Sequence, residues 1–164
     1  MALEIERKFL VIGSAWREKA HAVSAIAQGY LNDQNALKSG KERVSVRVRI
    51  QGDQAFVNFK SYEIGPSRQE FEYLIPPNEG RSLMALCVSG LIDKRRHLVR
   101  VGSHLWEVDE FLGDNAGLVV AEIELASSDE YFERPVWLGQ EVTDDWRYYN
   151  AALANYPYRN WEER

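Results

Sequence analysis

The sequence predicts a largely antiparallel β protein with a few helices, and two observations support this prediction. Several short runs alternate apolar with polar side chains, as expected of strands whose two faces differ. Turns rich in glycine, proline and asparagine separate these runs at regular intervals, which favours a barrel or a sandwich. No repeat, linker or low-complexity tract interrupts the pattern, so we expect residues 1–164 to form a single domain.

The first half of the chain contains four expected strands, the later ones rich in β-branched residues. They span residues 3–11, 42–50, 55–60 and 69–75, with a turn at 51–54, a loop at 61–68 and a stop at Pro76-Pro77. Trp16, Ala20, Val23 and Ala27 recur at helical spacing after Ser14, a candidate N-cap. Residues 14–27 are therefore predicted to form a helix. A short extended piece at 28–33 and a polar loop at 35–42 follow it.

The second half begins with an amphipathic pattern at residues 78–89, which predicts a helix that ends just before Gly90. Three more strands are expected at residues 91–101, 104–111 and 118–126, separated by turns that contain glycine. Residues 127–135 are expected to form one helical turn. Helical periodicity then predicts a last helix at 144–156, before Pro157.

Composition excludes several classes of protein. The formal charge of −5 gives no support to a general nucleic-acid-binding surface. No uncharged apolar stretch approaches the ~20 residues that cross a bilayer, and the charged start has no signal-peptide core. The single cysteine, Cys87, rules out an intrachain disulfide and a cysteine-based zinc site. We therefore expect a cytoplasmic protein that binds neither nucleic acid nor membrane.

The expected strands alternate apolar residues with charged ones, and the sign of the charge differs from strand to strand. On one face each they carry Glu4, Glu6 and Lys8; Arg43, Arg47 and Arg49; Asn58 and Lys60; Glu70 and Glu72; Lys94 and Arg96; Glu107 and Asp109; Glu122 and Glu124. For any one strand, the solvated side of an antiparallel sheet is the simpler explanation. Taken together, the strands argue against that explanation for the whole set. A solvated face more often carries Thr, Ser and Gln than like charges ~7 Å apart.

If the sheet curls into a barrel of about eight strands, these faces converge on a charged interior. Burying so many ions without a ligand would be unfavourable, since desolvation costs several kcal/mol per ion. Arginine and lysine there would bind phosphates or carboxylates, and clustered carboxylates would bind hard divalent cations. A metal-bound polyanion satisfies both sets of side chains.

The residues resemble the CYTH superfamily, also called triphosphate tunnel metalloenzymes. The likeness begins with EIERKF and continues in order through QGYL, VRVRI, NFK, RQEFEY, KRRHLV, WEVDEF, AEIEL and WLGQEVTDDWRYYN. The E-x-E-x-K core alone would be a weak signal, but the ordered set covers nearly the whole chain. The compact length resembles that of bacterial single-domain members.

The resemblance implies an eight-stranded antiparallel barrel that forms a closed tunnel with a charged interior. It implies metal ligands at Glu4, Glu6, Glu70, Glu72, Asp109, Glu122 and Glu124, for Mg²⁺ or Mn²⁺ at two sites. It implies phosphate-binding residues at Lys8, Arg47, Arg49, Lys60, Lys94 and Arg96, and a catalytic pair of Lys8 with Tyr30. Strand parity points Lys94 and Arg96 inward and Arg95 outward, although a bulge would reverse this.

The function implied is metal-dependent hydrolysis of a triphosphate, most simply inorganic tripolyphosphate to pyrophosphate and phosphate. Adenylate cyclisation and thiamine triphosphate hydrolysis are alternatives on the same scaffold, and a non-catalytic module that binds polyphosphate or a nucleotide is another. Paired glutamates argue against the last, because they would repel phosphate without metal. No base-stacking motif is evident, and Trp16, Tyr62 and Trp146 stay unassigned. The family tends toward homodimers, but nothing in the sequence identifies an interface.

Overall fold

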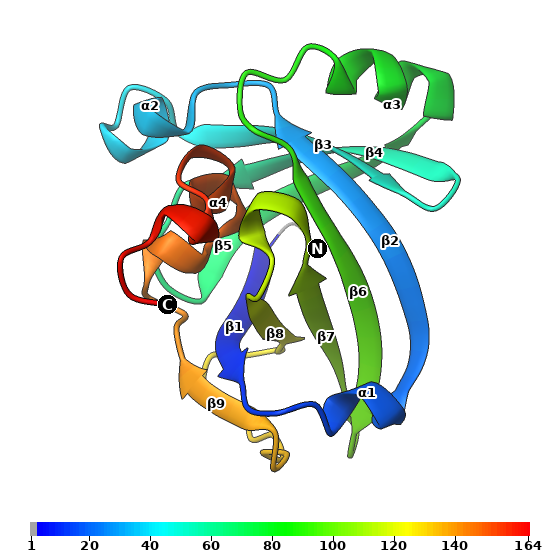
Figure 1. Cartoon of the computed structure of the whole chain (residues 1–164). Coiled ribbons are helices and arrows are strands. Elements are labelled where there is room, and N and C mark those ends of the chain that lie inside the picture. The colour runs from blue at the N-terminus through cyan, green and yellow to red at the C-terminus, as the bar shows by residue number, and fades with distance from the viewer. Residues whose placement is uncertain (1–2) are drawn as a thin grey trace.

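The computed structural model describes residues 3–164, and a sheet of nine strands dominates them (Figure 1). The strands are β1 (Leu3–Val11), β2 (Ala20–Tyr30), β3 (Val44–Gln51), β4 (Gln54–Ser61), β5 (Ser67–Ile75), β6 (Ile92–Val101), β7 (His104–Phe111), β8 (Val119–Glu124) and β9 (Leu138–Glu141). Except for β2 and β9, they arise from the alternating runs of the sequence or extend into the segments beside them. Because alternate side chains point to opposite faces, each strand presents one row inward and one outward.

Eight of these strands close into a ring in which every pairing is antiparallel. The order is β5-β4-β3-β2-β6-β7-β8-β1, and β1 returns to β5 through the pairs Leu3↔Gln69, Glu4↔Arg68 and Ile5↔Ser67. The short β9 lies outside the ring, beside β1. The predicted eight-stranded antiparallel barrel is confirmed. The sandwich alternative is excluded, because a sandwich has no ring closure.

The helices are few and short. They are α1 (Trp16–Lys19), α2 (Gln34–Lys38), α3 (Pro77–Met84) and α4 (Asn150–Asn155), with 3-10 turns η1 (Gly113–Asn115), η2 (Trp146–Tyr148) and η3 (Tyr158–Asn160). The helix expected at 78–89 is confirmed in its first half, and the helix expected at 144–156 is divided into η2 and α4. Within residues 3–164, no helix has the length and apolar character needed to cross a membrane.

The predicted helix at 14–27 is wrong beyond its first turn. Only Trp16–Lys19 is helical, and Ala20 turns extended to begin β2. That strand pairs with β3 on one side and with β6 on the other, so two ladders of hydrogen bonds replace the helical ones. Tertiary pairing thus overrides the helix propensity of its alanines.

Two smaller predictions also need correction, and one strand was not predicted. The turn expected at 127–135 is not helical, and the polar loop at 35–42 instead overlaps α2, which Asp33 caps by accepting a hydrogen bond from the Asn35 backbone N–H. The strand β9 was not expected. It forms on the side of β1 opposite β8, along the edge that β1 leaves free beyond Ile5, where its pairing with β5 ends.

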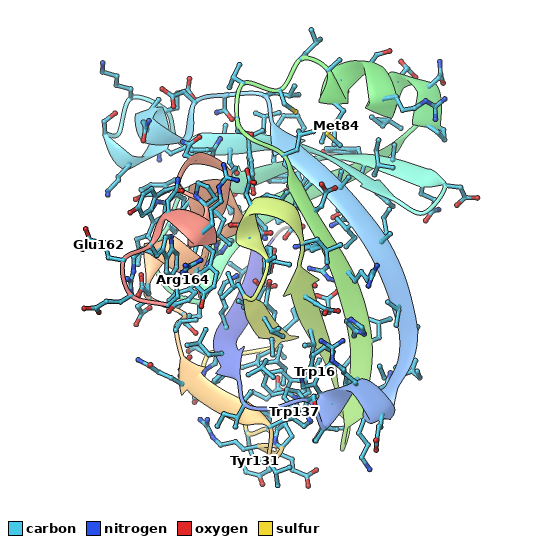
Figure 2. The ribbon with its side chains drawn as sticks, viewed as in Figure 1. Trp16, Met84, Tyr131, Trp137, Glu162 and Arg164 are labelled. Atoms are coloured by element: carbon cyan, nitrogen blue, oxygen red, sulfur yellow. The ribbon has the colours of Figure 1, made fainter. Side chains whose placement is uncertain are left out.

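The main hydrophobic core lies outside the barrel, against the wall made by β6, β7, β8 and β1. It consists of Phe9, Trp16, Val99, Trp106, Val108, Ala121, Ile123, Leu125, Phe132 and Trp137. Figure 2 shows Trp16 and Trp137 near each other at one end of the molecule. Helix α1 and the segment 126–137 cover this wall, so the outward rows supply the core and the inward rows are free for other tasks.

A second cluster covers one end of the barrel. Tyr30, Ile92, Phe111 and Val120, at adjoining strand ends, pack with Ala151, Leu153, Ala154 and Trp161 of the C-terminal segment. Helix α4 contacts α2, β2 and β6. The C-terminal segment therefore closes this end of the barrel, which we call the closed end.

Candidate active site

The inward rows of the barrel enclose a cavity of about 510 Å³. At about 30 Å³ per water molecule, it has room for roughly 15 waters or for a small polyanion with part of its hydration. Among residues 3–164, seven cationic side chains line it: Lys8, Arg47, Arg49, Lys60, Arg68, Lys94 and Arg96. Eight carboxylates line it as well: Glu4, Glu6, Glu63, Glu70, Glu72, Glu107, Glu122 and Glu124.

Every predicted site residue except Asp109 lines this cavity. Lys94 and Arg96 face it, whereas Arg95 is exposed on the outside of β6, as the parity of the strand predicts. Asp109 also points inward but is fully buried beneath other side chains. No bulge interrupts the pairing of β6 with β7, so the alternation holds along this wall.

The signs of the charges differ between opposite walls. Strands β8 and β1 are neighbours, and both carry carboxylates. Strand β3, four places from β8 around the ring of eight, carries Arg47 and Arg49. A ligand in the tunnel therefore has an acidic wall on one side and a basic wall on the other.

The acidic wall contains like charges in direct register. Glu6 lies across from Glu124, and Lys8 across from Glu122. One buried carboxylate oxygen, Oε2 of Glu4, has no hydrogen-bond partner among the described residues. A buried carboxylate oxygen without a partner is costly, and a cation would satisfy it.

The other predicted carboxylates already have cationic or amide partners. Lys60 Nζ lies 3.5 Å from both Glu4 and Glu70. Glu72 accepts a hydrogen bond from Arg49 at 2.7 Å. The amide nitrogen of Asn58, which is buried between these groups, donates to Glu70 at 2.8 Å and to Glu72 at 3.3 Å. The side chains of β3, β4 and β5 therefore hold Arg49 and Lys60 in fixed positions.

Asp109 joins the two cations of β6. It accepts from Lys94 Nζ at 2.7 Å, and both of its oxygens accept from the Arg96 guanidinium, at 2.8 and 2.9 Å. Burial alone would raise the pKa of Asp109, but Arg96 and Lys94 hold it below its ordinary value. Burial lowers the pKa of Lys94 to about 8, although Asp109 opposes the shift.

Lys8 and Tyr30 line the same cavity near its closed end. Lys8 Nζ lies 3.3 Å from Glu122. Burial opposes its charge, but Glu122 and Glu6 outweigh burial, and the pKa of Lys8 lies above its ordinary value. Burial also raises the pKa of Tyr30, while the charges of Arg47 and Lys8 act against that rise. At neutral pH, Lys8 is thus a cation and Tyr30 a neutral phenol.

Among the charged lining residues, Glu63 and Arg68 were missed in the sequence, and so were Tyr149 and Asn150. Arg68 shares the parity of Glu70 and Glu72 and could have been found if β5 had been extended back to Ser67. Glu107 was placed on the same face as Asp109 but was not assigned to the site, and it pairs with Arg96 at 3.0 Å. Tyr149 and Asn150 come from the C-terminal segment, which no periodicity connects with the barrel interior.

Exposure rises away from the closed end. The side chain of Lys94 is 2% exposed and that of Lys8 is 8% exposed, whereas those of Glu72 and Glu107 reach 32% and 34%. Solvent and ligands therefore reach the cavity most readily from the end that carries Glu72 and Glu107, which we call the open end.

The donors of the cavity fit a divalent cation that arrives together with an anion. Seven cations against eight carboxylates leave no positive excess for a bare polyanion. Within residues 3–164, no three Asp, Glu, His or Cys side chains converge as a finished metal site. Small hard cations such as Mg²⁺ are usually held by one or two carboxylates plus phosphate oxygens and water, so the phosphates of a ligand would complete the set.

Comparisons with known proteins agree with this geometry. The sequence profile of the CYTH domain matches residues 2–151. An inorganic triphosphatase of Acetivibrio thermocellus is 42% identical over 164 residues, which cover 99% of this chain and all of that protein. An inorganic triphosphatase of Nitrosomonas europaea is 38% identical and covers 92% of this chain and 96% of its own. A crystal structure of an inorganic triphosphatase, 33% identical, superposes with a TM-score of 0.64 over 92% of this chain and 97% of its own.

Proposed function

The chain belongs to the CYTH domain family, and on that premise we propose that it hydrolyses inorganic tripolyphosphate to pyrophosphate and phosphate inside its tunnel. The observation that carries the proposal is a closed barrel with acidic and basic walls on opposite sides. On the basic wall, Nε of Arg47 and Nε of Arg49 are buried without an acceptor among the described residues, and a neutral or cationic substrate would supply none. A chain of phosphates lying along the tunnel satisfies them.

Metal dependence is typical of the CYTH family, and we assign the first cation to the acidic wall. Its ligands are the glutamates of β1 and β8: Glu4, Glu6, Glu122 and Glu124. Glu70 and Glu72 would complete a second site, and Asp109 would orient it indirectly, because it is buried behind Lys94 and Arg96. A divalent cation bound there, Mg²⁺ or Mn²⁺, supplies neutralisation of phosphate charge and acidification of the attacking water.

The chain's own cations would bind and orient the substrate. Arg47, Arg49, Lys60, Lys94 and Arg96 donate to phosphate oxygens from several walls, which fixes the chain of phosphates in line for displacement. Water attacks phosphorus, and the P–O–P bond breaks as pyrophosphate leaves. Lys8, kept charged by Glu122, would stabilise the developing charge on the leaving oxygen, with Tyr30 beside it.

Phosphate release from a panel of substrates tests the proposal. Tripolyphosphate, ATP and thiamine triphosphate are each incubated with Mg²⁺, with Mn²⁺ and with a chelator. We expect the highest kcat/KM with tripolyphosphate and no release with the chelator. Preference for thiamine triphosphate, or cyclic AMP formed from ATP, would contradict it in favour of an alternative chemistry. Tight binding without release would indicate a non-catalytic module.

The acidic wall is tested by Glu4→Gln and Glu6→Gln. Each removes a charge but keeps the size of the side chain, and each should lower the metal-dependent rate at least ~100-fold. Glu18→Gln, at an exposed position of helix α1, is the matched control and should leave the rate unchanged. A near-wild-type rate in Glu4→Gln would remove that residue from the metal site.

The proposal also covers the domain organisation, the location, the partners and the assembly of the protein. We propose that residues 1–164 act as one unit, in the cytoplasm, on a small-molecule triphosphate. We propose no contact with nucleic acid or membrane, and a homodimer as the assembly. The mildly acidic charge and the single cysteine, Cys87, are consistent with these assignments.

A further inference from the structure

Asn150 lies at the closed end of the tunnel, where the C-terminal segment meets two strands of the ring. It is the first residue of α4, is half-buried and lines the cavity. Its Oδ1 accepts hydrogen bonds from Lys94 Nζ at 2.9 Å and from Gln28 Nε2 at 3.1 Å. Gln28 is fully buried in β2, and Lys94 is almost fully buried in β6.

These two contacts determine which way the Asn150 amide faces. A charged lysine can only donate, so the atom of Asn150 nearest to Lys94 is the oxygen. The same oxygen receives Gln28 Nε2. The Asn150 NH₂ group must therefore point away from both partners.

That NH₂ group is not engaged by any residue that the structure describes. Among residues 3–164 it makes no hydrogen bond, and it is not one of the fully buried polar atoms that lack one. The nitrogen therefore keeps some exposure, and since Asn150 lines the cavity, we infer that its two N–H donors face the end of the tunnel. The neighbouring wall there consists of Lys8, Lys94 and the Tyr149 ring, which lies 5.4 Å from Lys8 Nζ.

We propose that Asn150 is a substrate-binding residue whose NH₂ group donates to an oxygen of the phosphate at the closed end. The assignment rests on the proposed function for the identity of the substrate. Lys94 and Gln28 hold the amide in the donating orientation before the substrate arrives, so little freedom is lost on binding. A neutral donor can approach a phosphate already surrounded by cations without adding to their mutual repulsion.

Two substitutions separate donation to phosphate from mere support of Lys94. Asn150→Ala removes both the acceptor and the donor. Asn150→Asp keeps an oxygen for Lys94 and Gln28 but replaces the NH₂ group with a second oxygen, which repels phosphate. Asn155→Asp adds the same charge at the exposed end of α4 and is the matched control.

The readout is the Kd for an imido analogue of tripolyphosphate, whose P–N–P bridges resist hydrolysis, measured by calorimetry in Mg²⁺. We expect about tenfold weaker binding for Asn150→Ala, because a hydrogen bond to a charged group is lost. We expect at least ~30-fold weaker binding for Asn150→Asp, because a negative charge that repels phosphate replaces that hydrogen bond. Asn155→Asp should bind as the wild type does. Melting temperatures without ligand establish that each variant is folded.

Binding by Asn150→Asp that is equal to the wild type, or tighter than that of Asn150→Ala, would overturn the inference and leave Asn150 as a support for Lys94. Phosphate release is measured on the same samples. If the wild type binds the analogue but releases no phosphate, the proposed function fails, while the order of the variants still decides the role of Asn150. If the wild type does not bind the analogue, both fail.

Discussion

At the scale of single residues, Arg68 shows how the tunnel keeps a buried cation in place. Its guanidinium donates to the Gly65 carbonyl oxygen at 2.6 Å and stacks over the Tyr149 ring at 5.0 Å. It lies across from Glu4 in the β1–β5 pairing, while its Nε is buried without a partner in the described part of the chain. We therefore expect Arg68 to bind the substrate from the β5 wall, with Nε satisfied by a phosphate oxygen.

Replacing Arg68 with alanine should lower kcat/KM for tripolyphosphate about 10- to 100-fold, because a charge-assisted contact is worth roughly 1.5–3 kcal/mol. Steady-state phosphate release measures this. Arg95→Ala, on the exposed face of β6, removes the same charge and should have little effect. Equal losses in the two variants would mean that net charge, and not the position of Arg68, determines the rate.

Asp109 gives a second prediction at this scale. It is the shared anionic partner of Lys94 and Arg96, and its side chain is 0% exposed. Asp109→Asn should lower the free energy of unfolding by about 3 kcal/mol, because buried cations are left uncompensated. The matched variant Asp114→Asn breaks an exposed pair with Arg159 and should cost less than ~1 kcal/mol. Urea unfolding measures both, and equal losses would contradict the prediction.

At the scale of elements, α3 is positioned by a glycine. A Cβ on Gly80 would lie 2.4 Å from the Cβ of Ala55 in β4, so the helix backbone approaches the sheet closely. Gly→Ala inside a helix normally stabilises it by about 1 kcal/mol. Here the clash reverses the sign, and we expect Gly80→Ala to lower the free energy of unfolding by about 1–3 kcal/mol.

The double variant Gly80→Ala/Ala55→Gly should recover part of the stability lost in Gly80→Ala, because it removes the methyl group on the opposite side of the contact. Thermal unfolding of the single and double variants measures the coupling between the two positions. Turnover by the folded variants should stay unchanged, since α3 packs outside the barrel on β3 and β4. A fully additive double variant would argue against direct contact.

An ion pair between Arg7 of β1 and Glu141 of β9 connects the two strands, and its stability depends on pH. Glu141 of β9 accepts from Arg7 at 2.8 and 2.6 Å, and Thr143 also donates to it. The Arg7 hydrogen bond holds the pKa of Glu141 below its ordinary value of 4.5. A lowered pKa in the folded state means that the pair stabilises the protein above pH 4.5. This contribution is lost as the pH falls through the folded value.

Glu141→Gln should therefore lower the free energy of unfolding by about 0.5–1 kcal/mol at pH 7, a modest figure because the side chain is partly exposed. The difference from the wild type should shrink below pH 4.5 and vanish once the carboxyl is protonated in both states. Urea denaturation at pH 7, 5 and 3 measures it. An equal difference at all three pH values would mean that the carboxylate charge is not responsible.

The alternation of side chains predicted which residues of each strand face inward, because that period is a local property. It could not predict β2, since Ala20–Tyr30 becomes a strand through ladders to β3 and β6 that lie far away in the sequence. The start of β5 at Ser67 depends in the same way on a short pairing with β1. Arg68 was missed for that reason. Asn150 was missed because only the folded C-terminal segment brings it to the tunnel.

At the scale of the whole molecule, the fold places the hydrophobic core and the charged cavity on opposite faces of the same sheet. The outward rows of the barrel build the main core with the segments that cover them, so the interior does not need to be apolar. Among residues 3–164, the cavity can then be lined by fifteen Lys, Arg and Glu side chains, all but Glu63 on the strands of the barrel. Most of their charges are paired, but the acidic wall keeps like charges in register at Glu6 and Glu124. Without a ligand, that repulsion lowers the stability of the barrel.

Stability should therefore depend strongly on the ligand. A ligand that binds only the folded state stabilises it by about 4 kcal/mol at 1,000 times its Kd. For a chain of 164 residues this should raise the melting temperature on the order of 10 °C. We expect this shift with Mg²⁺ and the imido analogue of tripolyphosphate together, and much less with either alone, because only the pair satisfies both walls. Sulfate at matched ionic strength should not reproduce it. If Glu4→Gln and Glu6→Gln show the full shift, then the acidic wall is not where the cation binds.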